Sequence, residues 1–278
     1  MMQSIKTIFK AGNGPSSSHT IGPMNAANFI MRYYGNANFI KVTLFGSLAL
    51  TGKGHLTDYI IDQQMKDIPH EIIFNMDIIP AHPNTMLFEL YVMANNLVKS
   101  QYIYSIGGGL LSIEGVKQEE YKDIYEHHNL TEIKKYCKEN NTSLVDYILQ
   151  REDSDIKTYC NLVYMIMMES INRGLHTEGV LPGKLQVVRK AKQIYNAKLK
   201  NENDSMKEKR CISAYAFAVS EENASGGKIV TAPTCGSCGI IPSVIRYLEE
   251  QGASHDLIID GLLVAGLFGL FVKNNASI

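Results

Sequence analysis

The segment that decides the fold reads F-I-K-V-T-L-F-G-S-L-A-L-T-G-K-G-H and runs from Phe39 to His55. In its first seven residues, aliphatic side chains alternate with Lys41 and Thr43. Alternation with a period of two is typical of a strand with one buried face. A glycine-rich turn follows, and apolar positions then recur at near-helical spacing from Leu56 to Met65. The segment therefore predicts a strand, a turn and a helix, the ingredients of an α/β layer.

Similar patterns continue toward the C-terminus. Further strands are predicted over Glu71 to Ile78, Met86 to Met93 and Tyr102 to Ile106. After about Gly115 helical patterns replace them, over Leu130 to Glu139, Ser143 to Gln150 and Ile156 to Asn172. Ser143 or Thr142 can cap the second of these helices, because hydroxyl side chains are preferred N-caps. We therefore predict an α+β fold, with an N-terminal α/β sandwich domain over residues 1–150 and an all-helical domain over residues 151–278.

Composition narrows the classes of function. The chain has 278 residues, with 27 Lys and Arg against 28 Asp and Glu. This balance provides no basic surface for nucleic acid or an anionic membrane. The most apolar run, Leu257 to Val272, contains Asp260 and is shorter than the about 20 residues that cross a bilayer. We interpret it as a core helix and expect no membrane partner. Met1 to Lys10 has no secretory pattern, so we expect a cytoplasmic protein.

A first candidate site is the loop G-P-S-S-S-H-T-I-G-P-M from Gly14 to Met24. Its hydroxyl groups and backbone N–H groups can bind an anion such as a carboxylate. His19 adds a group that can transfer a proton near neutral pH. The alternative is structural, because a serine-rich loop also caps the helix predicted to begin near Ile21.

Two further loops carry histidines. The segment from Gly46 to His55 is superficially similar to a phosphate-binding loop, but Gly54 stands where that motif needs Ser or Thr. Nucleotide binding is therefore not supported. The segment A-H-P-N-T, from Ala81 to Thr85, contains His82. As for any histidine in a loop, its role can be catalytic or structural.

The fourth candidate site is G-G-K-I-V-T-A-P-T-C-G-S-C-G-I-I-P, from Gly226 to Pro242. Cys235 and Cys238 form a C-x-x-C pair ahead of an apolar run that predicts a helix from Ile240 to Leu248. A thiol at a helix N-terminus is expected to have a lowered pKa. The pair fits a redox site, half of a zinc site, part of an iron–sulfur site or two buried inert thiols.

Together these motifs resemble those of the iron–sulfur-dependent L-serine dehydratases, also called L-serine ammonia-lyases, and the resemblance covers nearly the whole chain. Seven segments occur in the order of that family: G-P-S-S-S-H-T-I-G-P-M from Gly14, G-S-L-A-L-T-G-K-G-H from Gly46, A-H-P-N-T from Ala81, S-I-G-G-G from Ser105, E-G-V-L-P-G from Glu178, A-Y-A-F-A-V-S-E-E-N-A-S-G-G from Ala214 and T-A-P-T-C-G-S-C-G-I-I-P from Thr231.

The resemblance implies a lyase of amino-acid catabolism and gluconeogenesis that converts L-serine to pyruvate and ammonia. It implies a [4Fe–4S] cluster held by three cysteines, with one open iron as Lewis acid and a protein base that removes the α-proton. The N-terminal domain would resemble allosteric substrate-binding domains, and the helical domain would be the catalytic one.

The resemblance also assigns residues. Cys238 matches the first cluster ligand of the family, and Cys235 is a weaker candidate because that position is often not cysteine. His19 and His82 are expected to be catalytic. The remaining candidates are expected to bind substrate: Ser16, Ser17, Ser18, Thr20 and Asn84.

The chain stops at Ile278, where the family continues into a segment with two further cysteines. We therefore expect a C-terminal truncation, and either a homodimer or an assembly with a chain that supplies that segment. Two alternatives remain. One is β-elimination on another small amino acid, since selectivity depends on pocket contacts. The other is a non-catalytic paralogue that binds an amino acid or a metal.

Overall fold

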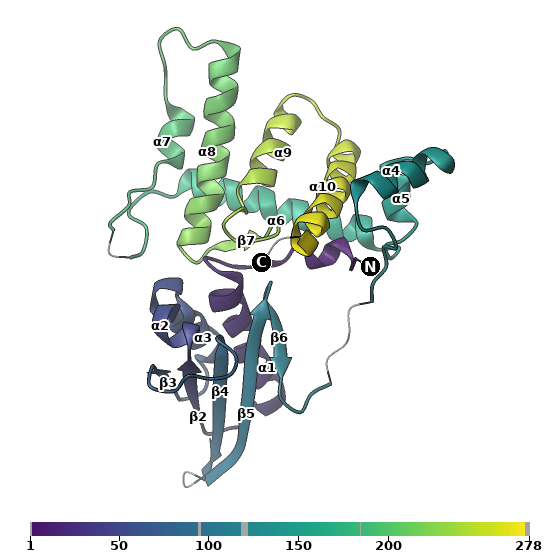
Figure 1. Ribbon diagram of the computed structural model, residues 1–278. Helices are drawn as coiled ribbons and strands as arrows, with labels where there is room; N and C mark the ends of the chain where they lie inside the picture. Colours follow the sequence, from purple (N-terminus) through teal and green to yellow (C-terminus); the bar gives the residue numbers. More distant parts are fainter. Residues whose placement is uncertain (1, 94–95, 118–121, 184, 276–278) are drawn as a thin grey trace. The chain divides into compact units, whose positions relative to one another are not determined.

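The chain folds into two compact units. The structure, a computed structural model, describes residues 2–93, 96–117, 122–183 and 185–275. Backbone contacts separate a sheet unit, Asn13–Glu119, from a helical unit that joins Met1–Gly12 to Glu120–Ile278 (Figure 1). These limits differ from the domain boundary predicted after residue 150. Residues before that boundary, such as Tyr147, belong to the helical unit because they are buried in its core.

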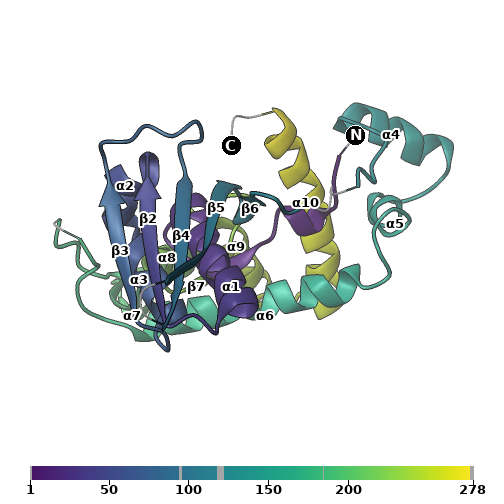
Figure 2. The ribbon, with the colours of Figure 1, turned by 90° about the horizontal axis from the view of Figure 1, so that it is seen from below.

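The sheet unit is built on five strands of the described chain, in the order β3-β2-β4-β5-β6 (Figure 2). The β2–β3 pair is parallel, and the other neighbours are antiparallel. The strands are β2 (Phe39–Phe45), β3 (His70–Asn75), β4 (Thr85–Val92), β5 (Asn96–Gly107) and β6 (Leu110–Ile113). The predicted strand at 39–45 is confirmed at both ends, and the sheet region followed by a helical region confirms the predicted α+β class.

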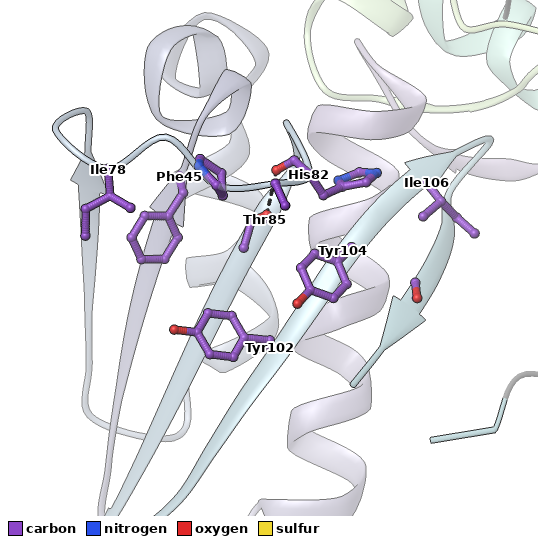
Figure 3. Close-up of a pocket in the computed structure, with 10 residues that line it drawn as sticks. Phe45, Ile78, His82, Thr85, Tyr102, Tyr104 and Ile106 are labelled. Atoms are coloured by element: carbon purple, nitrogen blue, oxygen red, sulfur yellow. Dashed lines mark hydrogen bonds between the residues drawn. The ribbon is translucent and has the colours of Figure 1, made fainter. Parts of the chain in front are cut away.

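Two helices share a core with one face of the sheet. Apolar side chains of α1 (Gly22–Tyr34) and α3 (Thr57–Met65) pack with strand residues such as Val42 and Phe88. These strand residues alternate with outward-facing ones, as the sequence pattern requires. Figure 3 looks onto the opposite face of the sheet, with side chains of the strands and of the connection from β3 to β4 drawn in front.

The helical unit contains α4 (Leu130–Glu139), α5 (Leu144–Leu149), α6 (Ile156–His176), α7 (Ala191–Asn196), α8 (Asp204–Ala224), α9 (Ile240–Glu250) and α10 (His255–Asn275). The prediction for α4 is confirmed at both ends. Ser143 caps α5 with a reciprocal capping box through Asp146, as its residue type indicated. The second half is not purely helical, because β7 (Lys228–Val230) pairs with β1 (Ala11–Asn13).

The charged stretch 198–210 contains the start of α8. Asn203 accepts a hydrogen bond from the Met206 N–H at 2.9 Å and so caps that helix. The cap satisfies a backbone donor that a helix start leaves unpaired.

The N-terminal segment completes the core of the helical unit. Ile5, Ile8 and Phe9, around η1 (Ile5–Thr7), are buried there. They lie against α10, where a Cβ added at Gly266 would come 2.8 Å from the Ile5 Cβ. By length and composition, α10 is the one helix among the described residues that could span a membrane. Its side chains from Ile258 to Leu270 instead contribute to this core, as predicted for a core helix.

Candidate functional site

The serine-rich loop of the sheet unit forms a short π-helical turn, η2 (Ser17–Ile21), directly before α1. Ser16 is its N-cap, and its hydroxyl accepts a hydrogen bond from the His19 N–H at 3.2 Å. The Ser17 carbonyl accepts from the Gly22 N–H. Ser16 therefore caps this turn, whereas α1 itself, the helix that the loop was predicted to cap, begins at Gly22 without a side-chain cap. The same turn holds His19 on the sheet unit.

Both ring nitrogens of His19 contact hydroxyl groups. Nδ1 lies 3.0 Å from Ser18 Oγ, and Nε2 lies 2.9 Å from Ser47 Oγ. Because a hydroxyl can donate or accept, either neutral tautomer of the ring satisfies both contacts. Burial lowers the pKa of His19, and the nearby His55 lowers it further. The ring is therefore biased toward its neutral form, which can accept a proton.

His55 is the main residue that the sequence reasoning did not single out. Its ring centroid lies 4.7 Å from that of His19. Its Nδ1 lies 3.0 Å from the Thr51 carbonyl, which can only accept, so Nδ1 carries the proton. In the neutral ring, Nε2 is then the nitrogen that can act as a base. In the sequence, His55 ends the G-K-G-H segment, one of the segments that carry the family resemblance.

Two threonines hold the histidines together. The Thr20 hydroxyl donates to the His55 carbonyl at 2.8 Å, and the Thr57 hydroxyl donates to the His19 carbonyl. Both threonine side chains are buried. The pairing is reciprocal, so each histidine backbone is fixed by the segment that carries the other. The Thr20 hydroxyl thus takes part in this link, and the substrate-binding role predicted for Thr20 stays a prediction.

A close backbone approach places Ser47. Gly46 adopts a positive φ of 57°, and a Cβ there would come 2.5 Å from the Pro83 carbonyl oxygen. Only glycine tolerates both conditions. The Ser47 N–H donates to the same carbonyl at 2.7 Å. This turn starts α2 (Ser47–Thr51) and presents the Ser47 hydroxyl to His19.

Asn84 and Ser105 supply polar atoms without a protein partner. Ser105 is fully buried, and its Oγ has no hydrogen-bond partner among the described residues; the same holds for Asn84 Oδ1. The Asn84 side-chain N–H donates to the Ser105 carbonyl at 3.4 Å. Buried polar groups are normally paired. Ser105 Oγ packs against Gly22 of α1, where an added Cβ would come 2.1 Å from it, so Asn84 Oδ1 is the candidate for a ligand contact.

His82 points elsewhere. Its ring packs against Tyr104 at a centroid distance of 5.7 Å, and its Nδ1 accepts from the Asn84 N–H at 3.1 Å. It lines a pocket on the outer face of the sheet (Figure 3). His19 instead contacts Ser47 and His55. The structure thus brings Ser16, Ser18 and His19 together but gives the His82 ring different neighbours. The catalytic role predicted for His82 stays a prediction.

In the helical unit, Cys235 and Cys238 lie in one tight turn before α9. The Cys238 N–H donates to the Cys235 carbonyl at 3.2 Å, and both side chains are buried free thiols. The expected lowering of their pKa is wrong. Burial raises the pKa of each thiol to about 12, and the neighbouring Cys235 adds to the effect at Cys238. Desolvation outweighs the helix N-terminus here, because a buried thiolate loses its hydration.

The thiols fit part of an iron–sulfur site. Two adjacent sulfur donors in a turn are suitable ligands for iron. Among the described residues, however, no group of three His, Cys, Asp or Glu side chains is placed to hold a metal ion. Cys137, Cys160 and Cys211 are therefore not gathered around this turn. The described part of the chain supplies at most two thiolates to such a cluster.

Comparison with known proteins places the chain in a family. The family model for the serine dehydratase alpha chain matches residues 91–278, and that for the beta chain matches residues 4–63. The chain is 35% identical to L-serine dehydratase TdcG of Escherichia coli K12, over 98% of its length and 72% of that protein. It is 33% identical to L-serine dehydratase of Haemophilus influenzae, over its whole length and 73% of that protein. These relatives are lyases, and the chain therefore belongs to the serine dehydratase family.

Proposed function

We propose that this protein removes water from L-serine and deaminates the product, giving pyruvate and ammonia. The observation that carries the proposal is the half-buried His19–His55 pair of imidazoles, with the Ser18 and Ser47 hydroxyls in contact with His19. It is supported by membership of a family whose similar members are L-serine dehydratases. A dehydration of this kind needs a base for the α-proton and assistance for the departing hydroxyl group.

We assign substrate binding to the η2 turn. The hydroxyls of Ser16 and Ser18 lie on the same turn as the His19 ring, at 3.5 and 3.0 Å from its Nδ1. Hydroxyl groups suit the carboxylate of an amino acid, because each can donate a hydrogen bond to it. Ser17 belongs to the same turn, and its hydroxyl is a further candidate. The fixed turn would hold the substrate's α-carbon near the histidines.

We assign the removal of the substrate's α-proton to the His19–His55 pair. His55 Nε2 is its accepting atom, since Nδ1 donates to the Thr51 carbonyl. His19 is held beside it by the two threonine links and by Ser47. The lowered pKa of His19 keeps the pair from binding two protons at once, because two adjacent imidazolium ions repel.

We assign the cofactor to Cys238, with Cys235 as the second sulfur. They would ligate a [4Fe–4S] cluster as thiolates, which requires each to lose the proton that burial favours in the metal-free state. When bound, such a cluster supplies Lewis acidity that assists the departure of a hydroxyl group. We propose that the protein is cytoplasmic. We also propose that it acts as a homodimer or in an assembly with a chain that supplies further ligands.

The experiment is anaerobic reconstitution of the protein from its complete reading frame with iron and sulfide. We expect visible cluster absorption and pyruvate from L-serine. Cys238→Ser should abolish both, whereas Cys137→Ser, a half-buried thiol on α4, is the matched control and should keep both. Threonine and cysteine as substrates test the neighbouring eliminations. A reconstituted protein with full absorption and no product from any of these amino acids would contradict the proposal.

A further inference from the structure

A pocket lies on the face of the sheet opposite to the one that packs against α1 and α3. Its cavity volume is about 490 Å³, within the range of small-molecule pockets. Phe45, Tyr102 and Tyr104 contribute aromatic rings to it. Ile78, His82 and Ile106 are further lining residues, and Figure 3 shows all six around the same hollow. None of these residues enters the function proposed above, although the sequence resemblance predicted a catalytic role for His82.

The strand register builds the floor of this pocket. Tyr104 pairs with Thr85, and Tyr102 pairs with Leu87, across the antiparallel β4–β5 ladder. Tyr102 and Tyr104 are two residues apart, so both rings project from the same face of the sheet. The connection from β3 to β4, which carries Ile78 and His82, forms part of the wall. The pocket is therefore supported by sheet backbone on one side.

The hydrogen bonds around His82 show which polar groups of the pocket can donate to a ligand. His82 Nδ1 accepts a hydrogen bond from the Asn84 N–H, so the neutral imidazole carries its proton at Nε2 and can donate from there. Thr85 donates to the His82 carbonyl at 2.6 Å, which fixes the backbone below the ring. Burial, together with Glu114 and Tyr102, raises the pKa of Tyr104, so its hydroxyl remains protonated.

The lining carries no formal charge. Among the described residues that line the pocket there is no Asp, Glu, Lys or Arg. An anion or a zwitterion such as L-serine would lose hydration there without gaining a Lys or Arg partner for its carboxylate, which is unfavourable. A flat, uncharged ring gains stacking on the tyrosines and hydrogen bonds from His82 and the phenols. The chemistry of the pocket thus differs from that of the serine-rich turn.

We propose that this pocket binds an uncharged, planar heteroaromatic compound with a hydrogen-bond acceptor in its ring. His82 then acts as a binding group for this ligand, which differs from the catalytic role predicted from the sequence. The site belongs to the sheet unit and is built from its strands. It is independent of the proposed dehydration, because none of its lining residues is assigned to the serine turn, the histidine pair or the thiols.

The test uses benzimidazole as the probe and the complete protein. Benzimidazole is flat, is uncharged at pH 8 and has one ring acceptor, whereas benzoate is a flat aromatic anion for which the lining offers no Lys or Arg. Saturation-transfer NMR and calorimetry should show benzimidazole binding and no benzoate binding. Tyr104→Leu should weaken benzimidazole roughly tenfold, the scale of one lost aromatic contact. Tyr102→Leu, at a partly exposed position, is a second variant that does not depend on core packing.

Tyr33→Leu is the matched control, because Tyr33 is an exposed tyrosine on α1 of the same unit. It should leave benzimidazole binding unchanged. The proposal is overturned if benzimidazole does not bind at millimolar concentration, or if Tyr104→Leu and Tyr102→Leu bind it as tightly as the control. It is also overturned if sedimentation shows that these variants lose self-association while benzimidazole binding is unaffected, since the face would then be a protein contact.

Discussion

At the scale of the residue, the distinctive feature is the contact between two imidazoles. His19 is partly buried and next to His55, and both effects oppose its protonation. We predict that His19 titrates below the ordinary histidine value of about 6.5. His55→Gln should move the midpoint upward by removing the second cause. NMR titration of the ring measures this, with His70→Gln in β3 as the control; a His19 midpoint above 6.5 would refute the assignment.

The same shift has a consequence for stability. When the folded pKa of a histidine is lowered, the unfolded chain binds more protons below about pH 6.5. The stability of the sheet unit should therefore fall as the pH drops from about 6.5 toward the lowered pKa. His19→Gln should flatten that part of the profile. Urea unfolding at a series of pH values tests this, and a wild-type curve that gains stability on acidification would contradict it.

At the scale of the element, the α6–α8 crossing depends on one glycine. A Cβ at Gly174 would lie 2.3 Å from the Ala218 carbonyl oxygen, a backbone atom that cannot rotate away. Gly174→Ala should destabilise the helical unit by about 1–3 kcal/mol through overpacking. Gly261 in α10 is the matched control, because a Cβ there meets nothing within 4 Å. Gly261→Ala should be stabilising by up to about 1 kcal/mol. Equal losses in both variants, measured by thermal unfolding, would refute this packing.

Elements whose signal is local were predicted from the sequence. The strand at Phe39–Phe45 and the helix at Leu130–Glu139 follow from periodicity and caps within the segment. By contrast, β5 (Asn96–Gly107) begins well before the predicted Tyr102, because its first residues pair with β4 and carry no alternation of their own. Partners across a sheet are nonlocal information that one segment does not contain.

The site shows the same limit. The serine turn and His19 were predicted because their residues adjoin in sequence. His55 was missed because its relation to His19 depends on two hydroxyl links across 35 or more residues. His82 also lies in a motif of the serine dehydratase family, but its ring packs against Tyr104 and not against His19. The C-x-x-C motif predicted paired thiols, but their raised pKa depends on burial that spacing does not reveal.

At the scale of the whole molecule, the chain crosses between units. Residues 1–12 belong to the helical unit, although the sheet unit separates them from the rest of it in sequence. Phe9 is fully buried there, and Glu152 accepts hydrogen bonds from the Ile5 N–H and the Tyr125 hydroxyl at 2.8 and 2.7 Å. The N-terminal segment has few apolar residues in its sequence. Its residues Ile5, Ile8 and Phe9 pack against apolar side chains of α10, far along the chain.

This division into two units predicts which unit a core mutation destabilises. Phe9→Ala should destabilise the helical unit by about 3–5 kcal/mol, the range for removing a buried aromatic ring. Hydrogen exchange should accelerate in α10 and α6 and stay unchanged in β2 and β4, because each unit has its own apolar core. Ile40→Ala in β2 is the reciprocal control. Faster exchange confined to the sheet unit in the Phe9 variant would contradict the division.

The central claim is that the His19–His55 pair removes a proton from L-serine. The most direct measurement is the rate of pyruvate formation by His19→Gln and His55→Gln proteins, reconstituted anaerobically to the same visible absorption as the wild type. The account predicts losses of about 10²- to 10⁴-fold in both variants, the usual contribution of a general base, at unchanged absorption. Wild-type rates in both variants at matched absorption would contradict it.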